Sequence, residues 1–385
     1  MPTPMPQSFL RLLTVAFVCC LLAGPAVATT FETAARAAIL IDHRSGDVLF
    51  EKNPDQAIPP ASMSKLMTAL VAFEELEAGN LTLEQMIPVS ERAWRMGGSR
   101  MFIEVGNRVS VHDLLQGIIV QSGNDACVAI AEALSGSEEA FADRLTRRGI
   151  EIGLTNSTIK NSTGWPHPEH LMSVRDLSTV ARQIISRFPQ FYQYYSQLEF
   201  EFNNINQRNR NPLLQAGIPG VDGMKTGYTR EAGYGLVASA ERNGRRLILV
   251  VAGLDSIAQR RSEAERLMEF GFRHFEEYRL FEPDTVVADA PVWQGAEPTV
   301  PLVAGEVVGI TLTRQARDTL KVKVVYDSPV PAPIQPGQVI GHVEMTAAGM
   351  PTRMMPLMAA RSVERAGVIG RMTGTLEYLV FGAPG

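Results

Sequence analysis

Apolar residues follow two different spacings along this chain, and the spacing changes from one segment to the next. Short apolar runs at 37–42 and 47–50 flank a polar turn, which predicts a β-hairpin. A second hairpin is predicted from the runs 235–240 and 247–254, because Asn243-Gly244 lies between them and an Asn-Gly pair favours a tight turn. We therefore expect strands near both ends of a first domain.

Between the two hairpins, apolar residues recur at the spacing of an amphipathic helix. Helices are predicted over residues 61–77, 111–120, 124–134 and 173–188. Pro60 marks the start of the first helix, and Ser110 with Asp113 forms a capping box at the start of the second. A helical block between terminal strands predicts an α+β domain whose end strands share one antiparallel sheet.

The composition changes beyond about residue 281. A last helix of the first domain is predicted over 263–278, and after it Val, Thr, Pro and Gly dominate short runs separated by turns. We expect a first domain over 29–280 and a small all-β sandwich domain over 281–363. Residues 364–385 have apolar side chains near helical spacing with arginines between them, which predicts an amphipathic tail that anchors the protein to a membrane surface. The alternative is a last helix docked on the β domain.

The first 28 residues have the pattern of a secretory signal peptide. The apolar run 12–22 is shorter than the roughly 20 residues that a bilayer-spanning helix needs. Ala26-Val27-Ala28 follows it with the small-x-small pattern of a signal-peptidase site, which predicts cleavage after Ala28. An uncleaved anchor helix is the alternative. We expect an exported protein.

Composition narrows the class of protein further. The chain has 385 residues, of which 45% are hydrophobic and 20% charged, so it is a folded protein with room for about two domains. A formal net charge of −5 and the absence of any nucleic-acid-binding module exclude nucleic acid as a partner. Two of the three cysteines lie in the signal segment, and Cys127 lies in an apolar run that predicts a core position.

Ser62-Met63-Ser64-Lys65 places a hydroxyl and an amine three residues apart at the start of a predicted helix. Positions three apart share one helical face, so Ser62 and Lys65 can meet. A serine needs an adjacent base to become a nucleophile, and a lysine with a pKa lowered by burial or by a second cation can be that base. The helix N-terminus adds backbone N–H groups for a developing oxyanion. The same spacing at 157–160 lies in a polar turn, and we set it aside.

Two further short motifs offer groups for binding and proton transfer. Ser122-Gly123-Asn124 lies between two predicted helices and supplies a hydroxyl and an amide, although alone it fits a turn with a helix cap. Lys225-Thr226-Gly227 precedes the second hairpin. The Lys and Thr can hold a carboxylate and the Gly permits close approach, although alone this sequence fits a surface strand.

Together and in this order, the three motifs resemble the active-site set of the penicillin-recognising serine acyl enzymes. That set has S-D-N as its second element, and this chain has S-G-N, as in the D-alanyl-D-alanine carboxypeptidase branch of low-molecular-mass penicillin-binding proteins. The stretches that resemble this branch are AAILIDHRSGDVLFEKN, IPPASMSKLMTAL, GGSRMFIEVG, QSGNDACVAIAE, KNSTGWPHPEH, VDGMKTGYT and, in the β domain, ARDTLKVKVVYDSPVPAPIQPGQ. The resemblance covers nearly the whole chain after residue 28.

The resemblance implies a role for each motif residue. Ser62 would be the acylating nucleophile and Lys65 its general base. Ser122 would pass a proton to the departing amine, and Asn124 would hold the peptide amide of the substrate. Lys225 is a second cation that we expect to lower the pKa of Lys65.

The same resemblance implies how the substrate is held. Lys225 and Thr226, with Gly227 beside them, would bind the terminal carboxylate. The backbone N–H groups of Ser62 and Tyr228 would form the oxyanion hole. Tyr228 takes a place often filled by His in relatives, which a main-chain donor tolerates.

The activity that the resemblance implies is that of a serine-type D-Ala-D-Ala carboxypeptidase, with 29–280 as its catalytic domain. It would remove the terminal D-alanine from peptidoglycan pentapeptide stems through an acyl-enzyme on Ser62, and β-lactam antibiotics such as penicillin would acylate and inhibit it. A peptidoglycan DD-endopeptidase would use the same residues and remains an alternative. A non-catalytic cell-wall-binding protein is disfavoured because all three motifs are intact.

A serine β-lactamase is a further alternative, because such enzymes deacylate through a glutamate-activated water. The matching Glu-x-x-x-Asn pattern occurs at Glu199 and Asn203. The alternation over 198–202 predicts a strand with its acids facing solvent, which argues against a water site there.

We expect no cofactor and no metal. His167 and His170 are close in sequence, but Pro166 and Pro168 make this segment a loop near the active-site entrance, and no HExxH helix is present. The signal segment and the tail predict a periplasmic protein on the outer face of the inner (cytoplasmic) membrane, in contact with the membrane surface through the tail.

Overall fold

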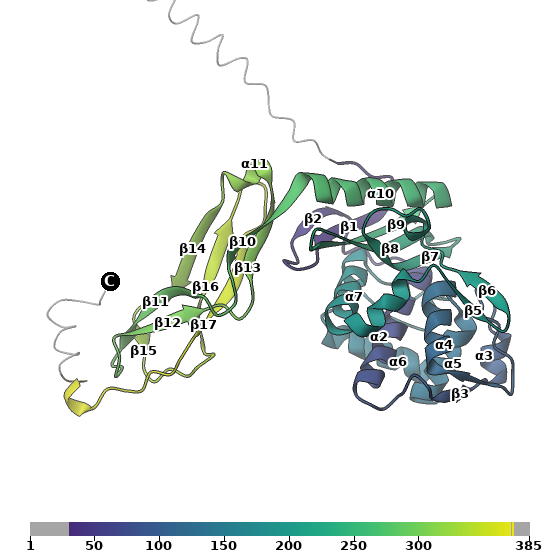
Figure 1. Cartoon of the computed structure of the whole chain (residues 1–385), viewed down its shortest axis with the longest axis horizontal. Coiled ribbons are helices and arrows are strands. Elements are labelled where there is room, and N and C mark those ends of the chain that lie inside the picture. Colours follow the sequence, from purple (N-terminus) through teal and green to yellow (C-terminus); the bar gives the residue numbers. More distant parts are fainter. Residues whose placement is uncertain (1–30, 371, 373–385) are drawn as a thin grey trace, which may run out of the picture. The chain divides into compact units, whose positions relative to one another are not determined.

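The computed structural model describes residues 31–370 and 372. Its first domain contains a five-stranded antiparallel sheet in which strands from both ends of the domain are neighbours (Figure 1). In spatial order the strands are β2 (Val48–Lys52), β1 (Ala37–Asp42), β9 (Arg245–Leu254), β8 (Gly233–Arg242) and β7 (Val221–Thr229). The expected sharing of one sheet by the end strands is confirmed, and β7 lies at an edge of this sheet.

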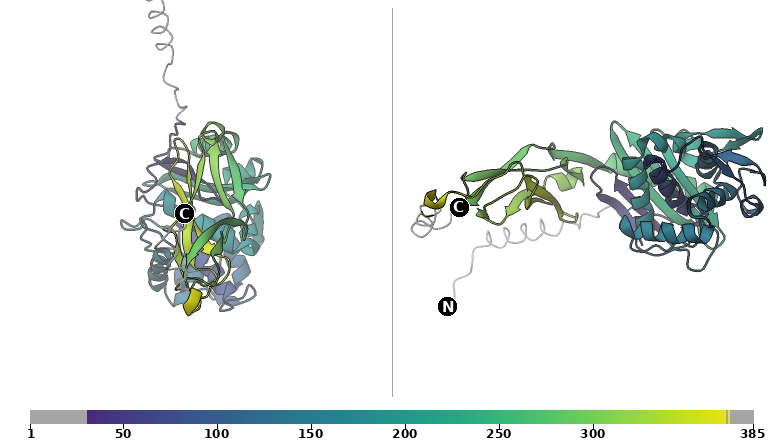
Figure 2. Two further views of the ribbon diagram at one scale, coloured as in Figure 1. Left: turned by 90° about the vertical axis from the view of Figure 1, so that its left-hand side faces the viewer. Right: turned by 90° about the horizontal axis from the view of Figure 1, so that it is seen from below.

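Helices pack on both faces of the sheet. α10 (Ile257–His274) packs against β8 and β9 on one face, and α7 (Val174–Arg187) packs against β1 and β9 on the other (Figure 1). Most other helices lie on the same side of the sheet as α7, as Figure 1 shows, and Figure 2 gives two further views of the molecule. The remaining helical segments are η1 (Ala61–Ser64), α2 (Lys65–Glu77), α3 (Glu91–Arg95), α4 (Val111–Gln116), η2 (Gly117–Gln121), α5 (Asn124–Ser135), α6 (Glu138–Glu151), α8 (Pro189–Tyr192), η3 (Gln193–Ser196) and α9 (Pro212–Gln215). Two small hairpins complete the domain, β3 (Met86–Pro88) with β4 (Arg108–Ser110) and β5 (Glu199–Phe202) with β6 (Ile205–Arg208).

α2 forms the centre of the helical block. Every side chain of this helix from Lys65 to Phe73 is buried, which is the pattern of a helix enclosed on all sides. Cys127 in α5 is also fully buried, as its apolar run predicts. The first residue of α2 is therefore held inside the core of the domain.

Local sequence signals place the ends of several elements correctly. The Ser110 side chain accepts a hydrogen bond from the backbone N–H of Asp113 at the start of α4, as the capping box predicts. Gly136 ends α5 with a φ of 78°. Asn243 and Gly244 both have positive φ, 53° and 75°, in the turn between β8 and β9.

The helix predicted over 263–278 is wrong at both ends. α10 begins six residues earlier, at Ile257, where the side chain of Ser256 caps it by accepting from the backbone N–H of Gln259. It ends at His274, and Phe275–Phe281 forms strand β10, which pairs with β13. The spacing of apolar residues does not show where α10 ends and β10 begins, because the aromatic residues of this segment suit either a helix face or a strand.

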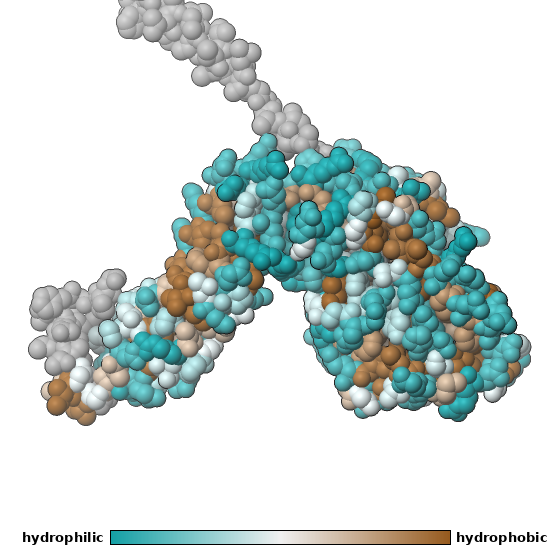
Figure 3. Space-filling view, viewed as in Figure 1, coloured by the Kyte–Doolittle hydropathy of each residue, from teal (hydrophilic) through white to brown (hydrophobic). Residues whose placement is uncertain are grey.

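The C-terminal part is an all-β domain, as predicted. It contains a two-stranded sheet, β10 with β13, and a six-stranded sheet in the order β14-β16-β17-β12-β11-β15. The elements are β11 (Val286–Trp293), β12 (Thr299–Val303), β13 (Val308–Thr313), α11 (Arg314–Arg317), β14 (Lys321–Tyr326), β15 (Val330–Pro331), β16 (Val339–Thr346) and β17 (Arg353–Ala359). Its core includes Leu302, Ile310 and Leu357, all almost completely buried. Apolar residues also gather on its surface over β14 and β16 (Figure 3).

The predicted tail lies mostly outside the described residues. Val368, Ile369 and Met372 are strongly exposed, and the other apolar positions of the tail prediction, Leu376, Leu379 and Val380, are not described. The predicted signal segment 1–28 is likewise outside the described range. Among the residues that are described, no helix has the length and apolar character needed to cross a membrane.

Candidate active site

Ser62 and Lys65 meet at the junction between η1 and α2. Lys65 Nζ donates a 2.8 Å hydrogen bond to Ser62 Oγ. The same amine donates to Asn124 Oδ1 at 2.7 Å and to the backbone carbonyl of Thr163 at 2.5 Å. The spacing of the first motif therefore brings its two functional groups into contact, and a residue of the second motif joins them.

Two glycines from other segments approach the backbone at the η1 turn closely. Gly164 has a φ of 80°, and a Cβ atom at this position would lie 2.0 Å from the carbonyl oxygen of Ala61. A Cβ atom on Gly227 of β7 would lie 2.8 Å from the carbonyl oxygen of Pro60. Ala61 itself has a φ of 48°, a conformation that non-glycine residues rarely adopt and that a fixed surrounding must maintain. The backbone beside Ser62 is thus fixed in a strained conformation.

Burial sets the protonation of Lys65. Removal of the ammonium from water is the main cause that lowers the pKa of Lys65, and the cation of Arg210 adds to it. The carboxylates of Asp125 and Glu138 act in the opposite direction, and the net result is a pKa of about 8. A lysine with this pKa is partly neutral near neutral pH. It can therefore accept a proton from Ser62.

The second motif joins η2 to α5. Ser122 ends η2 in the left-handed conformation, with a φ of 68°, and its side chain is 2% exposed. Asn124 is the first residue of α5, and its Nδ2 donates to the carbonyl oxygen of Gly97 at 2.8 Å. One N–H of this amide remains for a further acceptor, because Nδ2 has two hydrogens.

A buried carboxylate fixes the loop beside this motif. Asp125 is fully buried and accepts hydrogen bonds from the backbone N–H groups of Met101, Phe102, Ile103 and Ala126, at 2.9 to 3.3 Å. The backbone N–H of Asn124 in turn donates to the carbonyl oxygen of Ser99 at 2.7 Å. Asp125 therefore anchors the loop on which Asn124 rests, a function that sequence reasoning did not assign.

The third motif lies on the edge strand β7, which packs against η1. Lys225 and Thr226 are buried at 3% and 7% exposure, and Lys225 Nζ donates to the carbonyl oxygen of Thr226 at 3.1 Å. Tyr228 follows with its ring exposed and stacked on Tyr234, at 4.2 Å between ring centroids. The edge position leaves one side of β7 without a neighbouring strand, so an extended peptide can align with it.

Lys225 is not the cation that lowers the pKa of Lys65. Burial, the charge of Lys65 and the charge of Arg210 together lower the pKa of Lys225 well below its usual value. Among the causes of the lowered pKa of Lys65, the positive charge that contributes is that of Arg210 and not that of Lys225. Sequence reasoning missed Arg210, because it lies in the polar stretch after β6 with no motif around it.

The residues considered for other chemistries lie in different settings. Glu199 is exposed on strand β5, as the alternation of residues 198–202 predicts. His170 is buried, and burial lowers its pKa to about 4, with the charges of His167 and Lys65 adding to the shift. Within the described residues, no group of three or more His, Cys, Asp or Glu side chains is placed to hold a metal ion.

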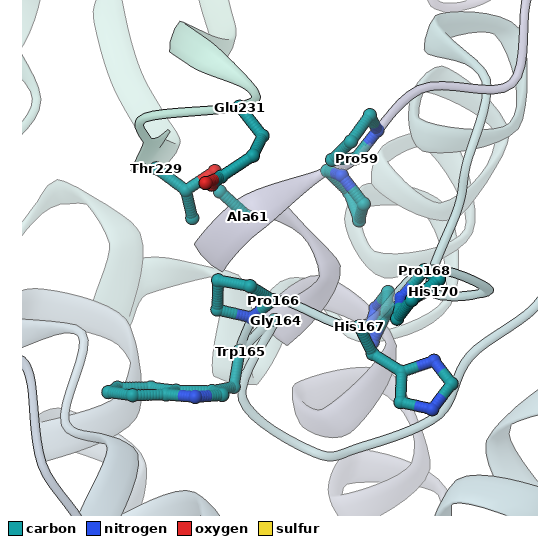
Figure 4. A pocket seen from close by; sticks show the side chains of 11 residues that line it. Pro59, Ala61, Gly164, Trp165, Pro166, His167, Pro168, His170, Thr229 and Glu231 are labelled. Carbon is teal, nitrogen blue, oxygen red and sulfur yellow. The ribbon is translucent and has the colours of Figure 1, made fainter.

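A cavity of about 290 Å³ adjoins this site (Figure 4). Ala61, next to Ser62, and Thr229, next to Tyr228, form part of its lining. The loop with Trp165 and His167 forms the opposite wall, so the expected position of this loop near the active-site entrance is confirmed.

Comparison with known proteins identifies relatives over both domains. Residues 25–256 match the family model described as D-alanyl-D-alanine carboxypeptidase, and residues 275–365 match the model described as the C-terminal domain of penicillin-binding protein 5. The chain is 39% identical to D-alanyl-D-alanine carboxypeptidase DacC of Escherichia coli, over 88% of this chain and 86% of that protein.

Solved structures of penicillin-binding proteins are similar to this chain as well. The structure of penicillin-binding protein 5 from Haemophilus influenzae matches with a TM-score of 0.84 and 35% identity, over 88% of this chain and all of that chain. Penicillin-binding protein D2 from Listeria monocytogenes in its ampicillin-bound form matches with a TM-score of 0.58 and 28% identity, over 63% of this chain and 99% of that chain. The chain therefore belongs to the D-alanyl-D-alanine carboxypeptidase family.

Proposed function

We propose that this protein removes the terminal D-alanine from peptidoglycan pentapeptide stems through an acyl-enzyme on Ser62. The observation on which the proposal depends is the 2.8 Å hydrogen bond between Lys65 Nζ and Ser62 Oγ. Burial lowers the pKa of this amine to about 8, so that it can serve as the general base for the serine.

The chemistry follows from the groups around Ser62. Its Oγ attacks the carbonyl carbon of the penultimate D-alanine while its proton moves to Lys65 Nζ. The backbone N–H groups of Ser62 and Tyr228 stabilise the oxyanion of the tetrahedral intermediate. Ser122 passes a proton to the nitrogen of the departing D-alanine as the C–N bond breaks. Water then hydrolyses the ester, which releases the shortened stem and restores the serine hydroxyl.

Substrate binding uses the edge of β7. Lys225 and Thr226 hold the terminal carboxylate, and a bound carboxylate favours the charged form of Lys225. Gly227 allows β7 and η1 to approach each other, which brings the carboxylate-binding groups close to Ser62. The free N–H of Asn124 Nδ2 donates to the peptide backbone of the substrate.

Purified protein without the first 28 residues tests the assignment directly. We expect release of D-alanine from a pentapeptide that ends in D-Ala–D-Ala, and covalent labelling at Ser62 by penicillin, located by mass spectrometry. Ser62→Ala should lose both, with a fall in D-alanine release on the order of 10⁴-fold or more. Ser157→Ala, in the second Ser-x-x-Lys sequence, is the matched control. Equal activity of wild type and Ser62→Ala would refute the assignment.

The same acylation makes β-lactams inhibitors of this protein. The likeness to the Listeria protein that was solved with ampicillin supports this part of the proposal. The exposed position of Glu199 on β5 argues against a glutamate-activated water, so the penicillin ester is long-lived. Cleavage of cross-linked muropeptides as fast as pentapeptides would instead identify a DD-endopeptidase.

The domain organisation and location complete the proposal. Residues 1–28 are a cleaved signal peptide, 29–280 form the catalytic domain, 281–363 form the β domain, and 364–385 attach the periplasmic protein to the outer face of the inner membrane. Exposure of Val368, Ile369 and Met372 at 65%, 80% and 70% supports the attachment. Truncation after Ala366 should move the mature protein from the membrane to the soluble fraction. Unchanged fractionation would contradict the anchor.

A further inference from the structure

Residues 161–165 form a loop that belongs to no helix or strand, yet this loop supplies one of the three acceptors around the Lys65 amine. The carbonyl oxygen of Thr163 accepts from Lys65 Nζ at 2.5 Å, and Thr163 is 1% exposed. A carbonyl group at this distance fixes the direction of one N–H of the amine. The direction of the lone pair that remains for Ser62 therefore depends on what holds this loop.

The side chain of Asn161 ties the loop together. Its Oδ1 accepts from the backbone N–H groups of Thr163, Gly164 and Trp165, at 3.2, 2.8 and 2.9 Å, and from the hydroxyl of Thr163 at 3.0 Å. Its Nδ2 donates to the carbonyl oxygen of Trp165 at 2.9 Å. An asparagine that binds backbone groups a few residues further on holds the chain in a turn. One side chain thus sets the path of the backbone through Thr163.

Ser162, the residue after this asparagine, is held from two sides. Its backbone N–H and its Oγ donate to Glu138 Oε1 at 3.2 and 2.8 Å, and its carbonyl oxygen accepts from Thr68 Oγ1 at 2.7 Å. Thr68 and Lys65 are three residues apart and share one face of α2. Successive carbonyl groups of an extended chain point in opposite directions, so two that both accept from this face require a turned backbone. The turn formed around Asn161 meets this requirement.

We propose that Asn161 is a positioning residue for the general base. Its amide holds the Thr163 carbonyl against Lys65, and this carbonyl directs the lone pair of the neutral amine at Ser62. Asn161 acts through the backbone of Thr163 and takes no part in the bonds that form and break. The inference rests on the proposed acylation of Ser62 and adds to it a residue outside the three motifs.

Two other roles for Asn161 predict different results. A role in stability alone lowers the melting temperature of a variant but leaves the acylation rate of the folded variant unchanged. A role in shaping the wall that Trp165 forms changes the penicillin concentration at half saturation but leaves the rate at saturation unchanged. The positioning role instead lowers the rate at saturation, because the bound ligand then faces a misaligned base.

Stopped-flow acylation by penicillin separates these roles. We expect the rate at saturating penicillin to fall about tenfold to a hundredfold in Asn161→Ala. The concentration at half saturation should change by less than about threefold, since the groups proposed to hold the carboxylate, Lys225 and Thr226, lie on β7. Each variant is measured below its melting temperature and at about pH 10. The pKa of Lys65 is about 8, so the amine is neutral under these conditions.

Replacements of graded chemistry isolate the amide oxygen. Asn161→Asp retains an oxygen for all the donors and loses only the bond from Nδ2, so its rate at saturation should lie within about threefold of wild type. Asn161→Ser forms the same kind of turn more weakly and should have an intermediate rate. Asn156→Ala is the matched control. It removes an amide whose Nδ2 donates to Thr155 Oγ1, and it should acylate as wild type does.

The outcomes separate this inference from the assignment on which it rests. A wild-type rate at saturation in folded Asn161→Ala would refute the positioning role, and so would a change confined to half saturation. If Asn161→Ala does not fold, a wild-type rate in Asn161→Ser has the same meaning. Equal losses in Asn161→Asp and Asn161→Ala would also contradict it, because the oxygen is then not what matters. If penicillin leaves Ser62 of the wild-type protein unlabelled, the carboxypeptidase assignment itself fails.

Discussion

Lys65 is 1% exposed, and its Nζ lies 2.8 Å from Ser62 Oγ. The two other acceptors around this amine are Asn124 Oδ1 and the carbonyl oxygen of Thr163. An ammonium group has three N–H donors, and these three acceptors satisfy all of them. When Lys65 loses a proton, Asn124 and Thr163 still hold the two remaining N–H groups. The lone pair of the amine then points at Ser62, which is the geometry that a general base for this serine requires.

The rate of acylation should depend on pH through the protonation of Lys65. Because only the neutral amine accepts the serine proton, the rate of acylation at saturating penicillin should rise about tenfold per pH unit below the pKa of Lys65 and level off above it. Burial lowers that pKa to about 8, so the bend should lie near this value. Stopped-flow measurement of acylation between about pH 6 and about pH 10 checks the profile. A rate independent of pH across this range would contradict the role of Lys65.

A matched pair of variants tests the same role without titration. Lys65→Met keeps the length of the side chain but has no base, so acylation should fall by a factor on the order of 10³ or more. Lys160→Met changes the lysine of the second Ser-x-x-Lys sequence, whose amine pairs with exposed Glu169 instead of a serine. Ser62 of the Lys160→Met variant should be acylated at the wild-type rate. Similar losses in both variants would mean that Lys65 acts only through stability.

The charge of Arg210 should affect the pH dependence of acylation without contact with Ser62. Its positive charge lowers the pKa of Lys65, so Arg210→Gln should raise that pKa and move the bend in the acylation profile to higher pH. At neutral pH the variant should therefore acylate more slowly, and at high pH it should recover. Arg208→Gln, at the end of β6, is the control and should leave the bend in place. An unshifted profile in Arg210→Gln would show that solvent screens this charge.

The parts of the site that sequence reasoning predicted are formed by residues that lie close together in the sequence. Ser62 and Lys65 belong to one helical turn, and Lys225 to Gly227 belong to one strand, so spacing alone determines which groups lie together. The two hairpins and their shared sheet were predictable from apolar runs that flank polar turns, and Asn243-Gly244 gave the clearest turn signal.

The parts that sequence reasoning missed depend on contacts between distant segments. The carbonyl of Thr163 meets Lys65 from a residue 98 positions away, and the charge of Arg210 reaches it from another loop. A polar loop residue gives no periodic signal, so no pattern in the sequence identifies its partner. The end of α10 was missed for a related reason, because pairing with β13 decides that Phe275 begins a strand.

Gly227 should be intolerant of even one added carbon. In Gly227→Ala the new Cβ would lie 2.8 Å from the carbonyl oxygen of Pro60 and 3.0 Å from Met63 Cγ, so η1 would have to move away from β7. Overpacking of this kind costs about 1–3 kcal/mol. We expect a lower melting temperature together with slower acylation, because Ser62 lies on η1. Gly367→Ala, where an added Cβ has open space, should change neither quantity. A fully active and stable Gly227→Ala would contradict the tight approach.

Asp125→Asn should weaken both the fold and the site. Asp125 Oδ2 accepts from the backbone N–H groups of Met101, Phe102 and Ile103, and Oδ1 accepts from those of Met101 and Ala126. Asparagine has one oxygen, so its NH₂ group must face backbone donors whichever way the amide turns.

An NH₂ group that is buried against backbone N–H groups should lower the free energy of unfolding by about 2–4 kcal/mol, and urea unfolding can measure this loss. The loop anchored by Asp125 also supplies the carbonyl of Gly97 to Asn124. Acylation should therefore slow in Asp125→Asn even at temperatures where the variant is fully folded. Asp143→Asn, at an exposed position on α6, is the control for loss of one charge. If Asp125→Asn unfolds like wild type, the loop is held by packing and the carboxylate does not anchor it.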